Sequence, residues 1–343
     1  MPRSSFFGSR GPFAAILFAP LLLLPVACGQ GDTTSQSTTT GAGGDPSATT
    51  TTGSGGSGGS GGSPGPAVPL TIVDWNTHNY FDAKKDPTLT GEILLSAADY
   101  SKKRVTIGAE LKALNGDIVM LSEVENKAIL DDLNTSELGG VYGTTYLIQG
   151  NDPRGIDVGL LSKITPDTIV SHKDDVFVKV GTNGPQYRYS RDCLEVHFTF
   201  NKRKLIVLGV HFKAKAAPDD PDKRLAEAQH TRKIADDLRA LEANAAILVL
   251  GDFNDTPGSK PYNAVTGAAP QLFVDSADSV PMAQRYSYDF SGKLELIDHQ
   301  MANPALHAML DPTSVVLAHA KNVDDSSKYA SDHAPIKATY LVR

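Results

Sequence analysis

The chain has 343 residues, of which 40% are hydrophobic and 21% charged, proportions that are ordinary for a soluble globular protein. Its formal net charge of −7 argues against tight nucleic-acid binding without a metal, because no basic excess is present. A nuclease is still compatible with this charge, since bound divalent cations neutralise phosphate locally.

The first 28 residues have the pattern of a bacterial lipoprotein signal peptide. Arg3 and Arg10 precede an apolar run, residues 13–24, which is too short to span a bilayer as a stable helix. A small residue then precedes Cys28, the position that such a signal presents for lipidation, although Pro25 stands where an aliphatic residue is usual. An ordinary secretory signal cleaved nearby is the alternative. We therefore expect a cell-envelope or extracellular protein, anchored to a membrane through lipid at Cys28.

Residues 29–68 form a second segment, dominated by Gly, Ser, Thr and Pro. A segment of this composition buries too little apolar surface to offset its ordering entropy, so we predict a flexible, disordered tether. The folded domain then comprises residues 69–343, a length that one large α/β domain accommodates.

Strand-like and helix-like patterns alternate along this domain. Apolar runs and alternating patterns predict strands at 70–75, 117–122, 146–149, 157–161, 194–200, 204–210, 245–250, 285–290, 294–301, 314–317 and 335–342. Helical periodicity predicts helices at 102–115, 127–138 and 222–243.

The first helix has Ile107, Leu111 and Leu114 on one face and is expected to end at Gly116. The expected core face of the third helix comprises Leu225, Ala228, Ile234, Leu238 and Leu241.

The order of these elements also predicts the architecture. Neighbouring strands without an intervening helix imply hairpins, so the sheets must be mixed rather than purely parallel. The sequence therefore predicts an α/β fold, a four-layer sandwich of two packed mixed β-sheets flanked by helices.

One strand end has an unusual combination of polar groups. Residues 245–250 form an apolar run that Gly251 terminates, and Asp252 and Asn254 follow. In extended geometry, side chains two residues apart leave the same face of the chain. The carboxylate and the amide are together able to hold a nucleophilic water and to hydrogen-bond a charged oxygen. An ordinary Asp/Asn turn after a strand would explain the same pattern.

Other acidic, amide or imidazole side chains also stand at strand ends. They are Asn76, Glu123, His211, Asp298, Asp332 and His333. Each has a structural explanation by itself, such as a turn residue, a helix-capping acid or a hydrogen-bonded core histidine. Together they provide what metal-assisted attack on phosphorus requires: oxygen ligands for a hard cation, a positioned base and an oriented water.

The order of these motifs resembles that of the endonuclease/exonuclease/phosphatase superfamily. The resemblance covers essentially the whole folded domain and rests on the segments 75–76, 121–124, 211, 251–254, 297–298 and 331–333. Within the superfamily, residues 123–126, 152–161 and 211–215 are similar to the deoxyribonuclease-I-like branch of bacterial extracellular and membrane nucleases.

The resemblance implies a metal site and a first set of catalytic residues. Asn76 and Glu123 would bind a divalent cation, Mg²⁺ in the first place, with Mn²⁺ or Ca²⁺ as alternatives. The histidine of Asp332-His333 would act at the scissile phosphate, and Asp298 would orient and stabilise its imidazolium. Asp252 and Asn254 would then position the attacking water and the phosphate.

The resemblance also implies residues that belong to the nuclease branch. His211 would be its second histidine, and Asp157 is the candidate for the acidic partner of His211, on position alone. Arg154 and Arg191 resemble arginines that contact phosphate, although solvated surface arginines would look the same in a sequence.

These observations predict a secreted, lipid-anchored, divalent-metal-dependent phosphodiesterase. The expected activity is that of a monomeric nuclease of low sequence specificity that hydrolyses DNA, with RNA as a further substrate. One alternative is a phosphodiesterase or phosphatase of the same fold that acts on a phospholipid or small phosphoester. The tether favours it, but no exposed apolar hairpin is evident. The other alternative is a non-catalytic surface binding protein, which the intact motif set disfavours.

Overall fold

The computed structural model describes residues 65–290, 292–319 and 331–343. The predicted signal peptide with Cys28, and residues 29–64 of the predicted tether, lie outside these ranges. Among the helices of the described ranges, none combines the length and hydropathy that crossing a bilayer requires.

The first sheet has six strands in the order β13-β14-β1-β2-β4-β3. These strands are β13 (Leu310–Leu317), β14 (Ile336–Val342), β1 (Val68–Tyr80), β2 (Ile118–Val124), β4 (Asp157–Ser162) and β3 (Thr144–Leu147). Only β1 and β2 run parallel, and the other neighbours are antiparallel.

The second sheet also has six strands, in the order β5-β6-β7-β8-β12-β9. They are β5 (Thr168–Ser171), β6 (Cys193–Phe200), β7 (Arg203–His211), β8 (Ala246–Asp252), β12 (Asp298–Ala302) and β9 (Val274–Asp275). The pair β7–β8 is parallel and the rest are antiparallel. A separate hairpin, β10 (Tyr288–Phe290) and β11 (Lys293–Glu295), precedes β12.

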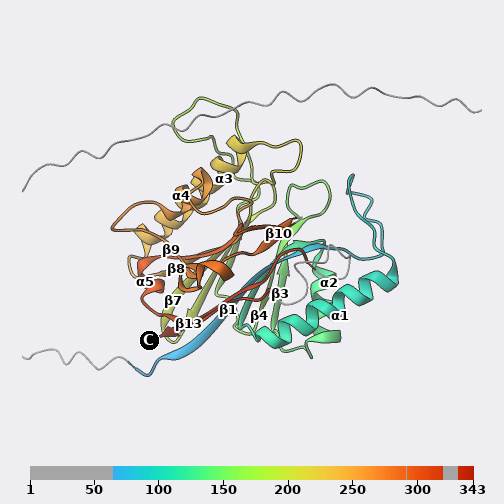
Figure 1. The fold of residues 1–343 in the computed structure, drawn as a ribbon, viewed down its shortest axis with the longest axis horizontal. Helices are drawn as coiled ribbons and strands as arrows, with labels where there is room; N and C mark the ends of the chain where they lie inside the picture. The colour runs from blue at the N-terminus through green and yellow to red at the C-terminus, as the bar shows by residue number, and fades with distance from the viewer. Residues whose placement is uncertain (1–64, 291, 320–330) are drawn as a thin grey trace, which may run out of the picture. The chain divides into compact units, whose positions relative to one another are not determined.

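Helices cover the outer faces of both sheets. The helices α1 (Ala97–Leu114) and α2 (Lys127–Asp132) lie on one side and α3 (Pro221–Leu241) and α4 (Lys260–Thr266) on the other (Figure 1). One apolar cluster joins the inner faces of the two sheets, and two further clusters join each sheet to its helices. A π-helical turn (Leu133–Glu137) extends α2, and the short α5 (Pro304–His307) follows β12. The predicted four-layer sandwich of mixed sheets is confirmed.

Several predicted details differ from the structure. The helix α1 begins earlier than predicted, after Ser96, whose Oγ accepts a hydrogen bond from the Asp99 backbone N–H at 3.1 Å. It ends at Asn115, which adopts the left-handed conformation (φ 50°), so the prediction of Gly116 as its end was wrong. The predicted strand 294–301 is two strands, β11 and β12, because the chain leaves the hairpin and enters the second sheet between them.

The buried face of α3 differs most from the prediction. Leu241 is 82% exposed, whereas Ala228 and Ile234 are buried as expected. Two charged residues, Arg224 and Glu227, are buried on this helix instead. Both charges are paired, Arg224 with acidic side chains and Glu227 with backbone N–H groups, and pairing is what allows a charge to be buried.

Candidate active site

The topology brings the predicted polar residues to one edge of both sheets. Parallel neighbours place their carboxyl ends together, so β1 ends beside β2 and β7 ends beside β8. The antiparallel partners of these strands begin at the same edge. The start of β12 and the segments that precede β6 and β14 therefore also lie there. A hydrogen bond of 2.9 Å from Asn76 Nδ2 of the first sheet to Asp252 Oδ2 of the second closes the gap between the sheets.

A hollow of about 510 Å³ opens at this edge. The residues predicted from the sequence that line it are Glu123, Arg154, Arg191, His211, Asp252, Asn254, Asp332 and His333. Asn76 and Asp298 are buried beneath it and hydrogen-bond to lining residues.

The backbone around the hollow is irregular at two of the predicted site residues, Glu123 and Asn254. Glu123 has φ 62° at the point where the pairing of β2 with both of its neighbours shifts register. His78 and Asn79 (φ 48° and 57°) lie in the matching irregularity of β1, and Asn254 (φ 52°) follows β8. Left-handed backbone at a residue other than glycine costs of order 1–3 kcal/mol and is concentrated at functional sites. The bulge aims Glu123 into the hollow instead of along the sheet.

His333 forms a buried pair with Asp298. The distance from His333 Nδ1 to Asp298 Oδ2 is 2.7 Å, and Ser287 Oγ donates a second hydrogen bond to the same oxygen at 2.7 Å. Trp75 Nε1 donates to the His333 carbonyl at 2.8 Å and so fixes its backbone. Burial alone lowers the pKa of His333, but the negative charge of Asp298 and its hydrogen bond outweigh it and raise the pKa to about 10. His333 is therefore an imidazolium at neutral pH.

His211 has the opposite protonation state. Its Nε2 lies 3.4 Å from Asp252 Oδ2, a contact that would favour protonation. Complete burial, followed by the positive charges of Arg191, His333 and Arg154, opposes protonation and lowers the pKa of His211 well below its ordinary value. His211 is therefore a neutral imidazole beside a charged one. Such a pair of groups with separated pKa values provides a base and an acid in one site.

Asp252 and Asn254 are held next to these histidines. The Asn254 backbone N–H donates to Asp252 Oδ1 at 2.7 Å, and Asn254 Nδ2 donates to the Phe212 carbonyl at 3.0 Å. Burial and then the charge of Asp298 raise the pKa of Asp252. Both side chains line the hollow, as predicted. A left-handed backbone conformation at Asn254 brings them together there, and not the extended geometry that the sequence suggested.

The donor set around Glu123 suits a hard divalent cation. Asn76 Nδ2 lies 3.3 Å from Glu123 Oε1, and the Asn79 N–H donates to Glu123 Oε2 at 2.8 Å. Asp332 Oδ1 and His78 Nδ1 are buried atoms without a hydrogen-bond partner among the described residues, 3.3 Å apart. The Glu123 and Asp332 carboxylates offer the oxygen ligands that a cation such as Mg²⁺ prefers, whereas the Asn76 oxygen accepts the His78 N–H at 2.9 Å and its nitrogen faces Glu123.

A second group of potential ligands fits a metal less well. Side-chain atoms of Asp252, Asp298 and His333 all lie within 4.8 Å of one another. However, Asp298 Oδ2 and His333 Nδ1 already bond to each other, and a metal between them would break the pair and displace its proton. The predicted cation position beside Asn76 and Glu123 leaves this pair intact.

The structure distinguishes the two predicted arginines. Both lie close to Asp152 Oδ2, Arg154 at 2.8 Å and Arg191 at 3.0 Å. Arg191 is only 2% exposed, which excludes a solvated surface arginine at that position. Asp157 Oδ1 accepts the Gly150 N–H at 2.7 Å, and the contacts of the described residues include no hydrogen bond or ion pair between Asp157 and His211.

Some residues of the hollow were not predicted from the sequence. Asp152 aligns the two arginines, and Ser287 holds Asp298, yet neither has a local pattern that indicates a partner. His78, which has no evident partner in the sequence, lies beside Asp332. Tyr288 and Lys293 of the β10–β11 hairpin form part of the wall. One feature of the sequence could have indicated that Tyr288 and Lys293 lie at the hollow: their hairpin immediately precedes Ile297-Asp298 in the chain.

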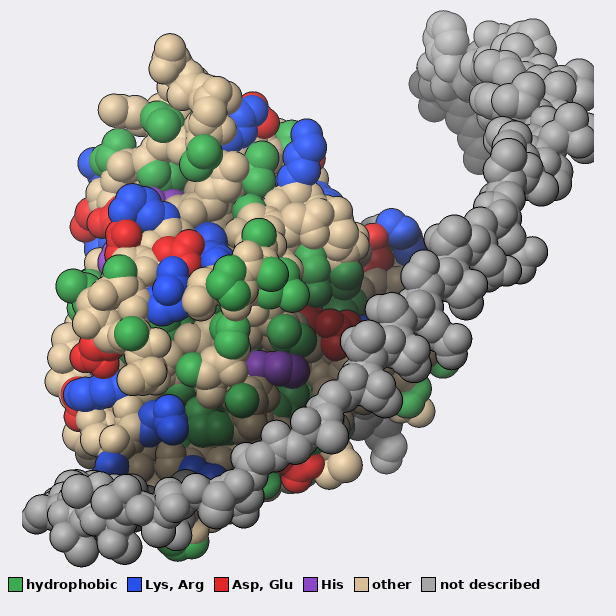
Figure 2. All heavy atoms as spheres, turned by 90° about the vertical axis from the view of Figure 1, so that its left-hand side faces the viewer, with side chains coloured by type: hydrophobic (Ala, Val, Ile, Leu, Met, Phe, Trp, Pro, Cys, Tyr) green, Lys and Arg blue, Asp and Glu red, His purple; other side chains and the backbone are tan. Residues whose placement is uncertain are grey.

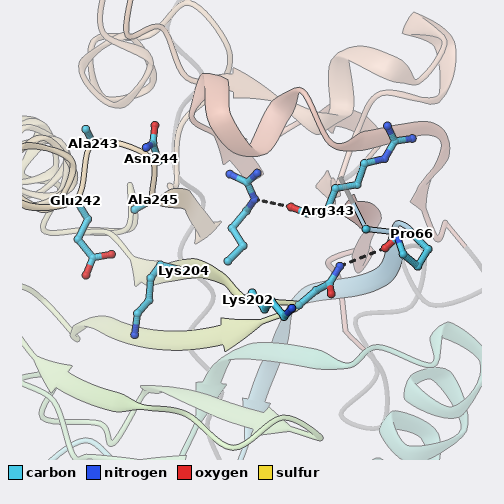
Figure 3. Close-up of a pocket in the computed structure, with 11 residues that line it drawn as sticks. Pro66, Lys202, Lys204, Glu242, Ala243, Asn244, Ala245 and Arg343 are labelled. Carbon is cyan, nitrogen blue, oxygen red and sulfur yellow. Dashed lines mark hydrogen bonds between the residues drawn. The ribbon is translucent and has the colours of Figure 1, made fainter. Parts of the chain in front are cut away.

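A larger cavity, of about 640 Å³, lies at the opposite end of the strands (Figure 3). Its wall includes Lys202, Lys204, Glu242 and Arg343. Arg203 Nε donates to the Arg343 carbonyl there at 3.1 Å. Its lining includes one acidic residue and no histidine, so it offers no acid–base pair. We therefore do not take this cavity as the reaction site, although it is the larger of the two.

Comparisons with known proteins identify the family and the fold. Residues 71–308 match the model of the Endonuclease/Exonuclease/phosphatase family. Truncated Caenorhabditis elegans TDP2 has a similar structure (TM-score 0.55, 15% identity, 80% of this chain and 98% of that chain covered). An endonuclease/exonuclease/phosphatase from Beutenbergia cavernae is also similar (TM-score 0.54, 16% identity, 80% of this chain and 72% of that chain covered). So is D. rerio TDP2 complexed with single strand DNA product (TM-score 0.52, 17% identity, 79% of this chain and 98% of that chain covered). No curated protein matches the sequence. At these identities, the structural likeness establishes the fold.

Proposed function

Since this chain belongs to the endonuclease/exonuclease/phosphatase family, whose members hydrolyse phosphodiester bonds, we propose that it is a divalent-metal-dependent nuclease that cleaves DNA with low sequence specificity. We further propose that it is exported and lipid-anchored at Cys28, with the segment between Cys28 and the described residues that lead into β1 as the tether. The pattern of the first 28 residues supports this location.

One observation carries the proposal: two buried histidines, His211 beside Asp252 and His333 paired with Asp298, border the same hollow, and their surroundings shift their pKa values in opposite directions. His211, as a neutral imidazole, accepts a proton from the attacking water, and His333, as an imidazolium, donates one to the leaving oxygen. Asp252 and Asn254 orient the water and the phosphate between them. Asp298 keeps His333 protonated and fixes its orientation.

The charged groups around these histidines suit a phosphodiester. A cation bound at Asn76 and Glu123 would neutralise the charge that develops on the phosphate oxygens. Arg154 and Arg191 border the same hollow and would bind the non-bridging oxygens. That D. rerio TDP2 has been seen with a single strand DNA product supports nucleic acid as the substrate class. On the face drawn in Figure 2, basic and acidic side chains are interspersed, so binding would depend on the hollow and its cation rather than on a broad basic surface.

A phospholipid is the second candidate, and one observation favours it. Leu294, on the β10–β11 hairpin that borders the hollow, is 52% exposed beside Lys293. One exposed leucine and one lysine provide less membrane contact than stable association requires, since a single weak anchor binds only marginally.

The assay that decides between them uses the purified protein on plasmid DNA, RNA and sphingomyelin, with Mg²⁺ and with EDTA. We expect DNA cleavage that EDTA abolishes. Hydrolysis of sphingomyelin alone would contradict the nuclease proposal, and binding without turnover of any substrate would indicate a non-catalytic protein.

A further inference from the structure

Four cationic side chains line the cavity of about 640 Å³ at the end of the strands that lies away from the reaction hollow (Figure 3). We call them the entry patch, and they are Lys202, Arg203, Lys204 and Arg343. Glu242 is the one acidic residue in the same lining. Gly65 and Pro66, which lead into β1, line the cavity as well, so the chain enters the fold beside these cations.

The acids near the entry patch do not balance its charge. Lys204 Nζ pairs with Asp167 Oδ2 at 3.2 Å, and Arg203 Nε donates to the main-chain oxygen of Arg343 at 3.1 Å. Four cations therefore face two acidic side chains, Glu242 and Asp167, and the main-chain carboxyl group of Arg343. A positive excess remains, and it attracts anionic groups.

The position of the entry patch is fixed relative to the point where the chain enters. Asn201 and Lys202 (φ 46° and 65°) form the two-residue turn between β6 and β7, and two left-handed residues in succession are typical of such tight hairpins. Asn201 Nδ2 donates to the Val342 carbonyl at 2.9 Å and to the Pro66 carbonyl at 3.4 Å (Figure 3). The basic turn is therefore tied both to the end of β14 and to the segment that leads into β1.

Exposed apolar side chains lie at the same end of the fold. Leu241, which the sequence pattern placed in the core, is 82% exposed and directly precedes Glu242 of the cavity lining. Val68 at the start of β1 and Leu341 near the end of β14 are also exposed. Basic side chains beside exposed apolar ones are typical of surfaces that lie on a membrane interface.

The reaction hollow lies far from this surface. The strand β1 starts at Val68 beside the end of β14 and reaches Asn76 beneath the hollow eight residues later. At a rise of about 3.3 Å per residue, these two residues are about 26 Å apart along the strand. A body bound at the entry patch therefore leaves the hollow open to solvent.

We propose that the entry patch binds the surface of a membrane that contains anionic phospholipids and thereby turns the reaction hollow away from it. The inference rests on the proposed lipid anchor at Cys28, which would bring this end of the domain to a membrane. An anchor confines the domain but does not orient it. Cations at the point of entry supply the orientation, because they attract lipid phosphate groups at the place where the tether ends. DNA then reaches the hollow from the aqueous side.

The test places an environment-sensitive NBD label at one of two exposed positions. Asn244→Cys puts it in the cavity lining, and Leu294→Cys puts it on the hairpin beside the reaction hollow. The full-length lipidated protein is reconstituted on phosphatidylcholine vesicles with and without phosphatidylglycerol. We expect the fluorescence at 244 to rise only with phosphatidylglycerol and to fall again in high salt, since salt screens surface charges. The fluorescence at 294 should not change.

Charge substitutions test whether the entry patch causes this contact. Lys202→Met and Arg203→Met should each lower the ratio of membrane-bound to unbound domain about fivefold. Among the described residues, the Lys202 side chain has neither a hydrogen bond nor an ion pair, so Lys202→Met tests the charge even if Arg203→Met lowers the melting temperature. Lys84→Met is the matched control, because Lys84 is exposed in the segment that follows β1 at the hollow end. It should leave the signal at 244 unchanged.

Three results would overturn the inference. The first is a rise at 294 instead of 244, which would place the reaction hollow on the membrane and favour a phospholipid substrate. The second is a signal at 244 that does not depend on phosphatidylglycerol or that survives both substitutions. The third is a rise at 244 when duplex DNA is added without vesicles and none when vesicles are added, which would make the entry patch a nucleic-acid surface.

Failure of the lipid anchor has a different signature. The unsubstituted protein should take up no NBD label, because Cys28 carries lipid and Cys193 is buried. Labelling of the unsubstituted protein at Cys28 would show that the anchor is missing. The Cys28→Ser protein, labelled at 244, is then mixed with the same vesicles. A rise with phosphatidylglycerol would support the entry patch without the anchor, and no rise would overturn both.

Discussion

His211 provides the sharpest test of the active site, because its chemical role and its structural role predict opposite results. As the base, it contributes on the order of 10²–10⁴ to the rate, so His211→Ala should reduce DNA cleavage at least about a hundredfold. His333→Ala should do the same through loss of the acid. The double variant should lose much less than the product of the two, since groups that act as a unit are not additive.

The structure also sets the expected change in stability. The His211 ring is buried, yet its Nδ1 has no hydrogen-bond partner among the described residues. Removing an unpaired buried group recovers about 1–3 kcal/mol, and loss of a large packed side chain costs about 2–5 kcal/mol. We therefore expect the free energy of unfolding of His211→Ala to fall by only about 1–2 kcal/mol.

His299 is the matched control, since it is as buried as His211 and lies outside the reaction hollow. Its Nδ1 is 2.7 Å from Asp275 Oδ2 and its Nε2 3.0 Å from the Asp255 carbonyl. Both neighbours accept, so both nitrogens donate and the ring is an imidazolium. His299→Ala leaves Asp275 buried without its partner, which should cost about 3 kcal/mol or more. The rate per folded molecule should remain nearly unchanged.

Cleavage of plasmid DNA at saturating Mg²⁺, with urea unfolding of each variant, separates the two roles. If His211→Ala behaves like His299→Ala, with lower stability and an unchanged rate per folded molecule, His211 is a core histidine. The proposed acid–base pair would then be wrong, and a different phosphoester would become the better substrate candidate.

Three further predictions concern the cation, pH and the tether. Glu123→Gln should weaken Mg²⁺ dependence and activity together without altering the melting temperature, and full activity at low Mg²⁺ would remove Glu123 from the metal site. Burial lowers the pKa of His299, but Asp275 outweighs it and the net pKa is raised, so its stabilisation is complete below about pH 6.5 and is lost as pH rises through the folded-state pKa. Urea titrations across that range should show the loss in the unsubstituted protein and a flatter profile in His299→Ala. A chain that begins at Gly65 should unfold cooperatively and keep its specific activity; a broad transition would show that the segment before it is structural.

The sequence alone was sufficient for the architecture and for the kinds of chemical group at the site. Apolar runs and 3.6-residue periodicity are local properties, and strands that follow one another without a helix imply hairpins and mixed sheets. An acid, amide or imidazole directly after a buried strand is also visible locally, as at Asp252 and Glu123. Which end of the sandwich these residues share follows from strand direction, so it could be predicted once the strands were placed.

The tertiary structure alone decided burial, partners and protonation. The sequence does not distinguish a solvated from a buried arginine at position 191. The tertiary structure shows that Arg191 is 2% exposed and paired with Asp152. Glu227 interrupts the apolar face of α3 in the sequence, yet it is buried because two backbone N–H groups from distant segments meet its oxygens. His211 and His333 are identical side chains, and both are buried. Burial and then nearby cations lower the pKa of His211, whereas at His333 the charge and hydrogen bond of Asp298 outweigh burial and raise the pKa. Burial and pairing depend on segments that lie far apart in the chain, and no local pattern encodes which of them will meet.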